Sequence, residues 1–164
     1  MPRILGIDPG SRVTGYGVID SDGRRSALVA SGCIKTRGVD FGQRLGEIYL
    51  GIQAVVNESQ PEEVAIESVF VARNPGSALK LGQARGAAIS AVVVAGCAVA
   101  EYSPRAIKQA LVGTGGAEKE QVQHMIRLLL GTRQKMALDE SDALAVALCH
   151  AHSRSTLASI EGAR

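Results

Sequence analysis

The sequence is poor in aromatic residues and contains no tryptophan. Of its 164 residues only three are Tyr and two are Phe, whereas 46% are hydrophobic. The core must therefore be built from aliphatic and alanine side chains, which favours helices packed closely on a sheet. A chain of this length buries about two-thirds of its unfolded surface, so it suits one domain that needs no stabilising metal or disulfide.

Cysteines and long apolar runs are also scarce. The three cysteines, Cys33, Cys97 and Cys149, are far apart and lie among apolar residues. This pattern argues against a disulfide framework, so we expect reduced thiols and a cytoplasmic protein. The most apolar segment, residues 87–100, is 14 residues long, short of the roughly 20 that a membrane-spanning helix needs. We expect no membrane partner.

The first apolar run predicts a short buried strand that ends in a carboxylate. Ile4, Leu5 and Ile7 precede Asp8, and Pro9-Gly10 then favours a tight turn. Asp8 is therefore expected at the end of a strand, where ligands often bind in open α/β sheets. The alternative is that Asp8 only accepts hydrogen bonds from the turn that follows it.

The remaining hydrophobic patterns predict an α/β protein. Further strands are expected over residues 13–20, 26–35, 64–67 and 97–102, and helices over residues 41–59, 77–95, 104–113, 117–130 and 139–150. The first three strands follow one another as an antiparallel meander. We expect one domain over residues 1–153 and a flexible tail over residues 154–164, which show no apolar period.

Other acids occupy positions comparable to that of Asp8. Glu67 ends the strand predicted over residues 64–67, and Asp139 and Asp142 open the last helix. On a helix Asp139 and Asp142 are only about 60° apart, whereas Glu140 points well away from Asp142. The alternative for this pair is helix capping, because acids are favoured at the start of a helix.

Four carboxylates gathered in one place would repel one another unless cations lay between them. Oxygen ligands without a Cys or His cluster select Mg²⁺, with Mn²⁺ as a substitute. Two such ions about 4 Å apart form the arrangement that hydrolyses phosphodiesters. The net charge is only +2, so setting four acids aside leaves a basic surface that suits a polyanionic substrate.

Five blocks of the sequence resemble the RuvC-type Holliday-junction resolvases of bacteria. They are residues 4–17, 65–70, 77–86, 117–119 with 121–125, and 139–145, and they span nearly the whole chain in order. The resemblance implies an RNase H-like fold: a five-stranded mixed sheet, with three antiparallel strands and then two parallel ones, and helices on both faces.

The resemblance also implies roles for individual residues. The four catalytic and metal-binding carboxylates of the family fall on Asp8, Glu67, Asp139 and Asp142. Residues that contact the junction in the family match Phe70, which wedges or stacks at the branch point, and the basic residues Lys108 and Lys119. The third acid is open, because Glu140 directly follows Asp139 and residues 131–138 match the family poorly; the helical face favours Asp139.

Charge and position add three further residues that we expect to contact DNA. No Asp or Glu occurs in residues 68–100, and this stretch contains Arg73, Lys80 and Arg85 beside Phe70. A basic segment of this kind suits a phosphate backbone.

The implied function is the resolution of four-way DNA junctions in recombination and repair. Members of the family act as homodimers that make two symmetric, Mg²⁺-dependent nicks, and RuvA and RuvB, the branch-migration proteins, are the implied partners. One alternative is a junction-binding protein without catalysis, although a pure binder gains nothing from carboxylates next to phosphates. The other is a nucleotide-binding protein of the actin-like or sugar-kinase class, which needs two domains and therefore a longer chain.

Overall fold

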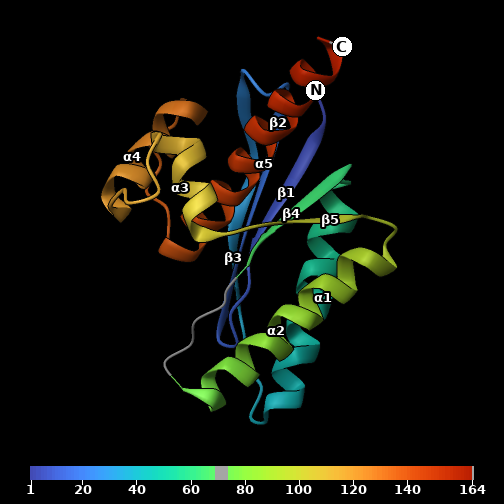
Figure 1. The fold of residues 1–164 in the computed structure, drawn as a ribbon. Helices are drawn as coiled ribbons and strands as arrows, with labels where there is room; N and C mark the ends of the chain where they lie inside the picture. Colours follow the sequence, from blue (N-terminus) through green and yellow to red (C-terminus); the bar gives the residue numbers. More distant parts are fainter. Residues whose placement is uncertain (69–73, 164) are drawn as a thin grey trace.

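The computed structural model describes residues 1–68 and 74–163 and places five strands and five helices there (Figure 1). The strands are β1 (Arg3–Asp8), β2 (Val13–Ser21), β3 (Ser26–Lys35), β4 (Glu63–Glu67) and β5 (Val99–Tyr102). The helices are α1 (Phe41–Ser59), α2 (Pro75–Val94), α3 (Pro104–Val112), α4 (Lys119–Leu130) and α5 (Leu138–Gly162).

The strands form one mixed sheet in the order β3-β2-β1-β4-β5. Strand β1 pairs antiparallel with β2, and β2 pairs antiparallel with β3. On the other side, β1 pairs parallel with β4, and β4 pairs parallel with β5. This arrangement confirms the predicted sheet of three antiparallel strands followed by two parallel ones.

Helices cover both faces of the sheet, with α3, α4 and α5 on one face and α1 and α2 on the other (Figure 1). Because side chains alternate along a strand, β1 contributes Ile4 to the core under α5, and Leu5 and Ile7 to the core under α1 and α2. All three are buried. The strand that ends in Asp8 is therefore held from both sides.

Helix α5 lies directly on the sheet because glycines face it. A Cβ added at Gly6 would come closer than 3.0 Å to the backbone oxygen of Ala143, and one added at Gly15 would meet that of Asp139 as closely. The missing side chains let the backbone of α5 approach β1 and β2. This contact sets the first two turns of α5 above the end of β1.

The helix starts follow the expected capping chemistry. Ser103 precedes Pro104 and its hydroxyl accepts a hydrogen bond from the N–H of Ala106 at 3.1 Å, as its N-cap position predicts. Helix α2 begins at Pro75, two residues before the predicted start, because the side chain of Asn74 caps it.

The prediction that the last helix ends near His150 is wrong. Helix α5 continues to Gly162, so most of the residues assigned to a tail after residue 153 belong to the helix. Neither Gly nor Pro interrupts residues 138–161, and Arg154 Nε lies 2.7 Å from Glu63 Oε1. The lack of a regular apolar pattern after residue 153 did not mark the end of the helix, because this end of the helix is held by polar contacts.

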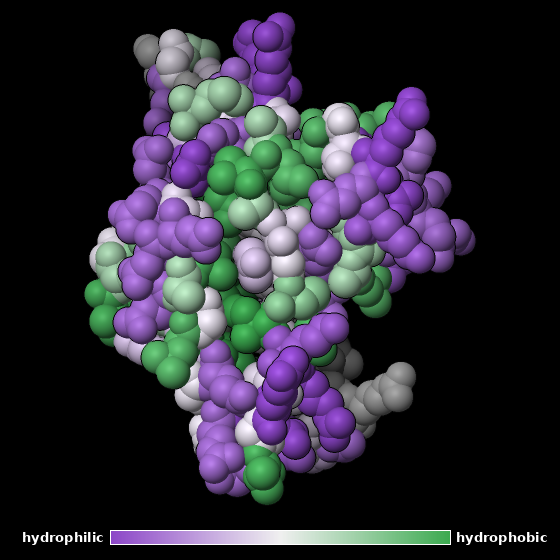
Figure 2. Space-filling model, turned by 180° about the vertical axis from the view of Figure 1, so that it is seen from behind, coloured by the Kyte–Doolittle hydropathy of each residue, from purple (hydrophilic) through white to green (hydrophobic). Residues whose placement is uncertain are grey.

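The surface shown in Figure 2 carries hydrophobic as well as hydrophilic side chains. Hydrophobic side chains gather in the middle of the face seen in Figure 2, and hydrophilic side chains lie on both sides of them. In the part of the chain that the structure describes, no helix combines the length and apolar composition that crossing a bilayer requires.

Candidate active site

The ends of β1 and β4 place two of the predicted acids side by side. The strands run parallel with Ile7 opposite Ile66, so the next residues, Asp8 and Glu67, follow at the same edge of the sheet. Both acids belong to the set of alternating positions that faces α5, as do Ile4 on β1 and Ala65 on β4. The sheet therefore directs both carboxylates toward α5.

The first two turns of α5 bring the other two acids, Asp139 and Asp142, to the same place. Burial raises the pKa of Asp8 to about 8, together with the negative charges of Asp142, Asp139 and Glu67 and a hydrogen bond with Asp139. Burial also raises the pKa of Glu67, and the charge of Asp142 adds to this effect. The structure thus gathers all four predicted acids into one cluster, which we call the acidic site.

Asp139 and Glu140 point to different partners although they are neighbours in the sequence. Asp139 interacts with Asp8, whereas both carboxylate oxygens of Glu140 are engaged by Ser31 of β3 and by the backbone of Ala137. This geometry supports Asp139 as the third member of the acidic site. The sequence reasoning missed the contact with Ser31; the only signal was a Glu at the position in the first turn that commonly bonds back to the helix start.

The acidic site has the donor chemistry of a site for a hard divalent cation. Its four side chains offer only oxygen atoms, the ligands that Mg²⁺ and Mn²⁺ prefer. The raised pKa of Asp8 means that the protein opposes a further negative charge there, and a cation would offset that charge. Within residues 1–68 and 74–163, no three His, Cys, Asp or Glu side chains converge closely enough to hold an ion as they stand.

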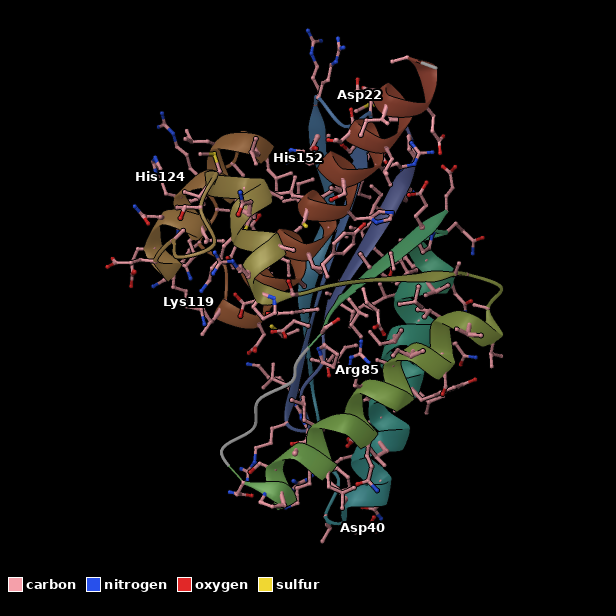
Figure 3. All side chains as sticks on the ribbon, viewed as in Figure 1. Asp22, Asp40, Arg85, Lys119, His124 and His152 are labelled. Atoms are coloured by element: carbon pink, nitrogen blue, oxygen red, sulfur yellow. The ribbon has the colours of Figure 1, made fainter. Side chains whose placement is uncertain are left out.

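A cleft of about 220 Å³ opens beside the acidic site, between α3, α4 and the start of α5. Glu67 and Asp142 line it together with Lys108 and Lys119. Lys119 Nζ lies 3.7 Å from Asp142 Oδ2, and Figure 3 shows Lys119 at the end of α4 that is nearest to the start of α5. Two of the predicted DNA-contacting lysines therefore stand next to the carboxylates.

The other predicted DNA contacts are placed differently. Phe70 and Arg73 lie outside the described residues. Lys80 and Arg85 belong to α2, which packs on the face of the sheet opposite α5 (Figure 3). Arg85 Nη2 lies 2.6 Å from Glu101 Oε1, and Lys80 Nζ lies 6.0 Å from the centre of the Phe41 ring. The structure does not bring Lys80 and Arg85 to the cleft.

Metal-free protein should lose stability as the pH rises from about 4 to about 8. In this range the folded state keeps a proton on Asp8, whose pKa rises from 3.8 to about 8, whereas the unfolded state has released it, so folding becomes less favourable with increasing pH. The side chain at position 8 in Asp8→Asn cannot ionise, so this variant does not lose stability in this way as the pH rises. It should raise the melting temperature at pH 8 by several degrees, since about 1 kcal/mol shifts a domain of this size by roughly 2–4 °C.

Calorimetry in a chelator, from pH 4 to pH 8, measures this effect. The wild type and Asp8→Asn should have similar melting temperatures at pH 4 and diverge as the pH increases. Parallel curves for the two proteins would mean that Asp8 is not the group that carries the excess negative charge.

Sequence comparison identifies a family for the chain. Residues 4–150 match the family described as crossover junction endodeoxyribonuclease RuvC. A protein of that name from Methylococcus capsulatus is 59% identical over 157 residues, which cover 96% of this chain and 94% of the relative. The match therefore includes both strands and the helix that supply the acidic site.

Structural comparison gives the same family and the same fold. Thermus thermophilus RuvC, solved in complex with a Holliday junction substrate, superposes with a TM-score of 0.90 at 36% identity, covering 95% of this chain and 96% of that one. The yeast mitochondrial Holliday junction resolvase Ydc2 shares the fold at 10% identity with a TM-score of 0.71, covering 96% of this chain and 82% of that one. The chain has the predicted RNase H-like fold and belongs to the RuvC family of crossover junction endodeoxyribonucleases.

Proposed function

We propose that this endonuclease resolves four-way DNA junctions with two Mg²⁺ ions held by the acidic site, Asp8, Glu67, Asp139 and Asp142. The observation that carries the proposal is the gathering of these carboxylates around Asp8, next to a cleft with two lysines. The relative from Thermus thermophilus, which has nearly the same fold, is described in complex with a Holliday junction.

Each part of the site has a task in phosphodiester hydrolysis. The bound ions would activate the attacking water and stabilise the leaving oxygen. Asp8 lies at the end of the central strand, where burial and the charges of Asp142, Asp139 and Glu67 raise its pKa, so it would be the central ligand of the acidic site. Lys108 and Lys119, which line the cleft beside Glu67 and Asp142, would bind phosphates of the DNA backbone next to the acidic site.

A homodimer is the form that suits a junction with two-fold symmetry, because two such sites can then make paired symmetric nicks. Helix α2 supports this part of the proposal. Leu79, Val93 and Val94 on α2 are 65%, 54% and 72% exposed, and Gly82 and Gly86 have open space where a side chain would be. Small residues at this spacing allow two helices to approach closely. The proposal also includes RuvA and RuvB as further partners and action in the cytoplasm; the resemblance to the family supports both.

The proposal is tested by incubating the purified protein with a labelled four-way junction and with a linear duplex of the same sequence. We expect paired nicks in two strands of like polarity, ends that a ligase can seal, and activity that requires Mg²⁺. Equal cutting of the linear duplex, or cutting of the junction in a chelator, would contradict it.

Lys108→Ala and Lys119→Ala should each weaken junction binding and cleavage. Each change removes a positive charge from the cleft that Glu67 and Asp142 line, so the slope of log Kd against log salt should fall by about one per lysine. Arg24→Ala is the matched control, because Arg24 is exposed in the β2–β3 turn at the other end of the sheet. Binding titrations at several salt concentrations measure the slope; unchanged slopes in both lysine variants would remove these lysines from the DNA interface.

A further inference from the structure

We propose that Glu140 is a positioning residue of the acidic site. Its carboxylate fixes the first turn of α5 to β3, so that Asp139 and Asp142 are presented to the ends of β1 and β4. The inference rests on the proposed function, since it concerns the affinity of the acidic site for its metal ions.

Glu140 is bound at both of its carboxylate oxygens. The hydroxyl of Ser31 donates a hydrogen bond to Oε1 at 2.5 Å, and the backbone N–H of Ala137 donates one to Oε2 at 3.1 Å. The residue is only 8% exposed. The carboxylate therefore joins the middle of an edge strand to the residue that precedes α5.

This connection acts on Asp139 and Asp142, two of the four carboxylates of the acidic site. Asp139 directly precedes Glu140, and its backbone oxygen lies against Gly15 of β2. The start of α5 is thus held by backbone contact with β2 and by a side-chain contact with β3. Rotation or lifting of this turn would move Asp139 and Asp142 relative to Asp8.

A buried carboxylate is unfavourable unless it is well compensated. Here the compensation comes from an O–H group, an N–H group and the positive end of the α5 dipole. The same contacts leave Glu140 directed at β3 and not at Asp8. Glu140 therefore orients residues that bind metal and does not bind the metal itself. Loss of such an orienting residue weakens metal binding.

The experiment measures nicking of the four-way junction as a function of Mg²⁺ concentration for the wild type, Glu140→Gln, Ser31→Ala and the double variant. Each single variant should raise the half-saturating Mg²⁺ concentration roughly ten-fold, with a rate at saturating Mg²⁺ within a factor of about three of the wild type. Because Ser31 acts only through its contact with Glu140, the double variant should cost no more than Glu140→Gln alone.

Two outcomes would overturn the inference. If Glu140 were itself a metal ligand, Glu140→Gln would abolish nicking at every Mg²⁺ concentration and Ser31→Ala would not. If Glu140 only capped α5, both variants would lower the melting temperature and leave the Mg²⁺ dependence unchanged. Ser31→Ala removes only one hydroxyl, so it tests the inference even if Glu140→Gln does not fold.

The same assay separates this inference from the proposed function. Mg²⁺-dependent nicking by the wild type, together with its loss in Asp8→Asn, tests the function of the acidic site. If both hold while Glu140→Gln and Ser31→Ala follow the wild-type Mg²⁺ curve, only the role of Glu140 is wrong.

Discussion

Asp8→Asn should reduce cleavage of a four-way junction at least about a thousand-fold, which corresponds to the several kcal/mol that a metal ligand contributes to the transition state. The substitution keeps the shape of the side chain and removes the charge that interacts with Asp142, Asp139 and Glu67. Glu67→Gln should act in the same way, because Glu67 lies beside Asp8 at the end of β4. Single-turnover rates at saturating protein measure the loss.

Junction binding should survive both substitutions. Removing a carboxylate from the acidic site lessens its repulsion of the phosphate backbone, so the affinity should stay the same or increase. Asp22→Asn is the matched control: Asp22 lies in the β2–β3 turn, far from Lys119 and the start of α5 (Figure 3). Nicking at the wild-type rate by Asp8→Asn would show that the site is misassigned.

Gly15→Ala should have the second largest effect, although the residue carries no functional group. A Cβ at this position would come closer than 3.0 Å to the backbone oxygen of Asp139, so the start of α5 would have to move away from β2. Overpacking of this kind costs roughly 1–3 kcal/mol of stability. Displacement of the ligands by about 1 Å can cost about a hundred-fold in rate.

Gly46→Ala separates this effect from the general effect of replacing glycine. Gly46 lies in α1 with nothing within 4 Å of the added Cβ, so the change should stabilise the helix by roughly 0.5–1 kcal/mol and leave cleavage unchanged. Chemical denaturation and single-turnover cleavage measure the two effects. Full activity and stability in Gly15→Ala would contradict the close packing of α5 on β2.

Local patterns were sufficient to predict most of the fold and the composition of the acidic site. Strand β1 could be predicted because an apolar run ends at Asp8 in a turn, and helix α3 because Ser103 and Pro104 mark its start. The gathering of the acids was predictable because two strands end in carboxylates and parallel neighbours end at the same edge. These signals lie within a few residues of the features that they specify.

Features that depend on distant residues could not be predicted. Glu140 is anchored by Ser31, which is 109 positions away in the sequence, and Arg85 is paired with Glu101. Arg85 was assigned to a DNA interface from its charge alone. Its ion pair with Glu101 and the position of α2 depend on how the helices cover the sheet. The end of α5 was missed because its last part is held by an ion pair with β4, which leaves no apolar period in the sequence.

The central claim is that Asp8, Glu67, Asp139 and Asp142 hold the metal ions. Anomalous scattering from a crystal of the protein grown with a four-way junction and Mn²⁺ tests it most directly. The account predicts two Mn²⁺ peaks per protomer, about 4 Å apart, with Asp8 as a ligand and oxygen atoms of Glu67, Asp139 and Asp142 around them. Peaks held by Glu140, or Mn²⁺ bound elsewhere while these four carboxylates stay free, would contradict it.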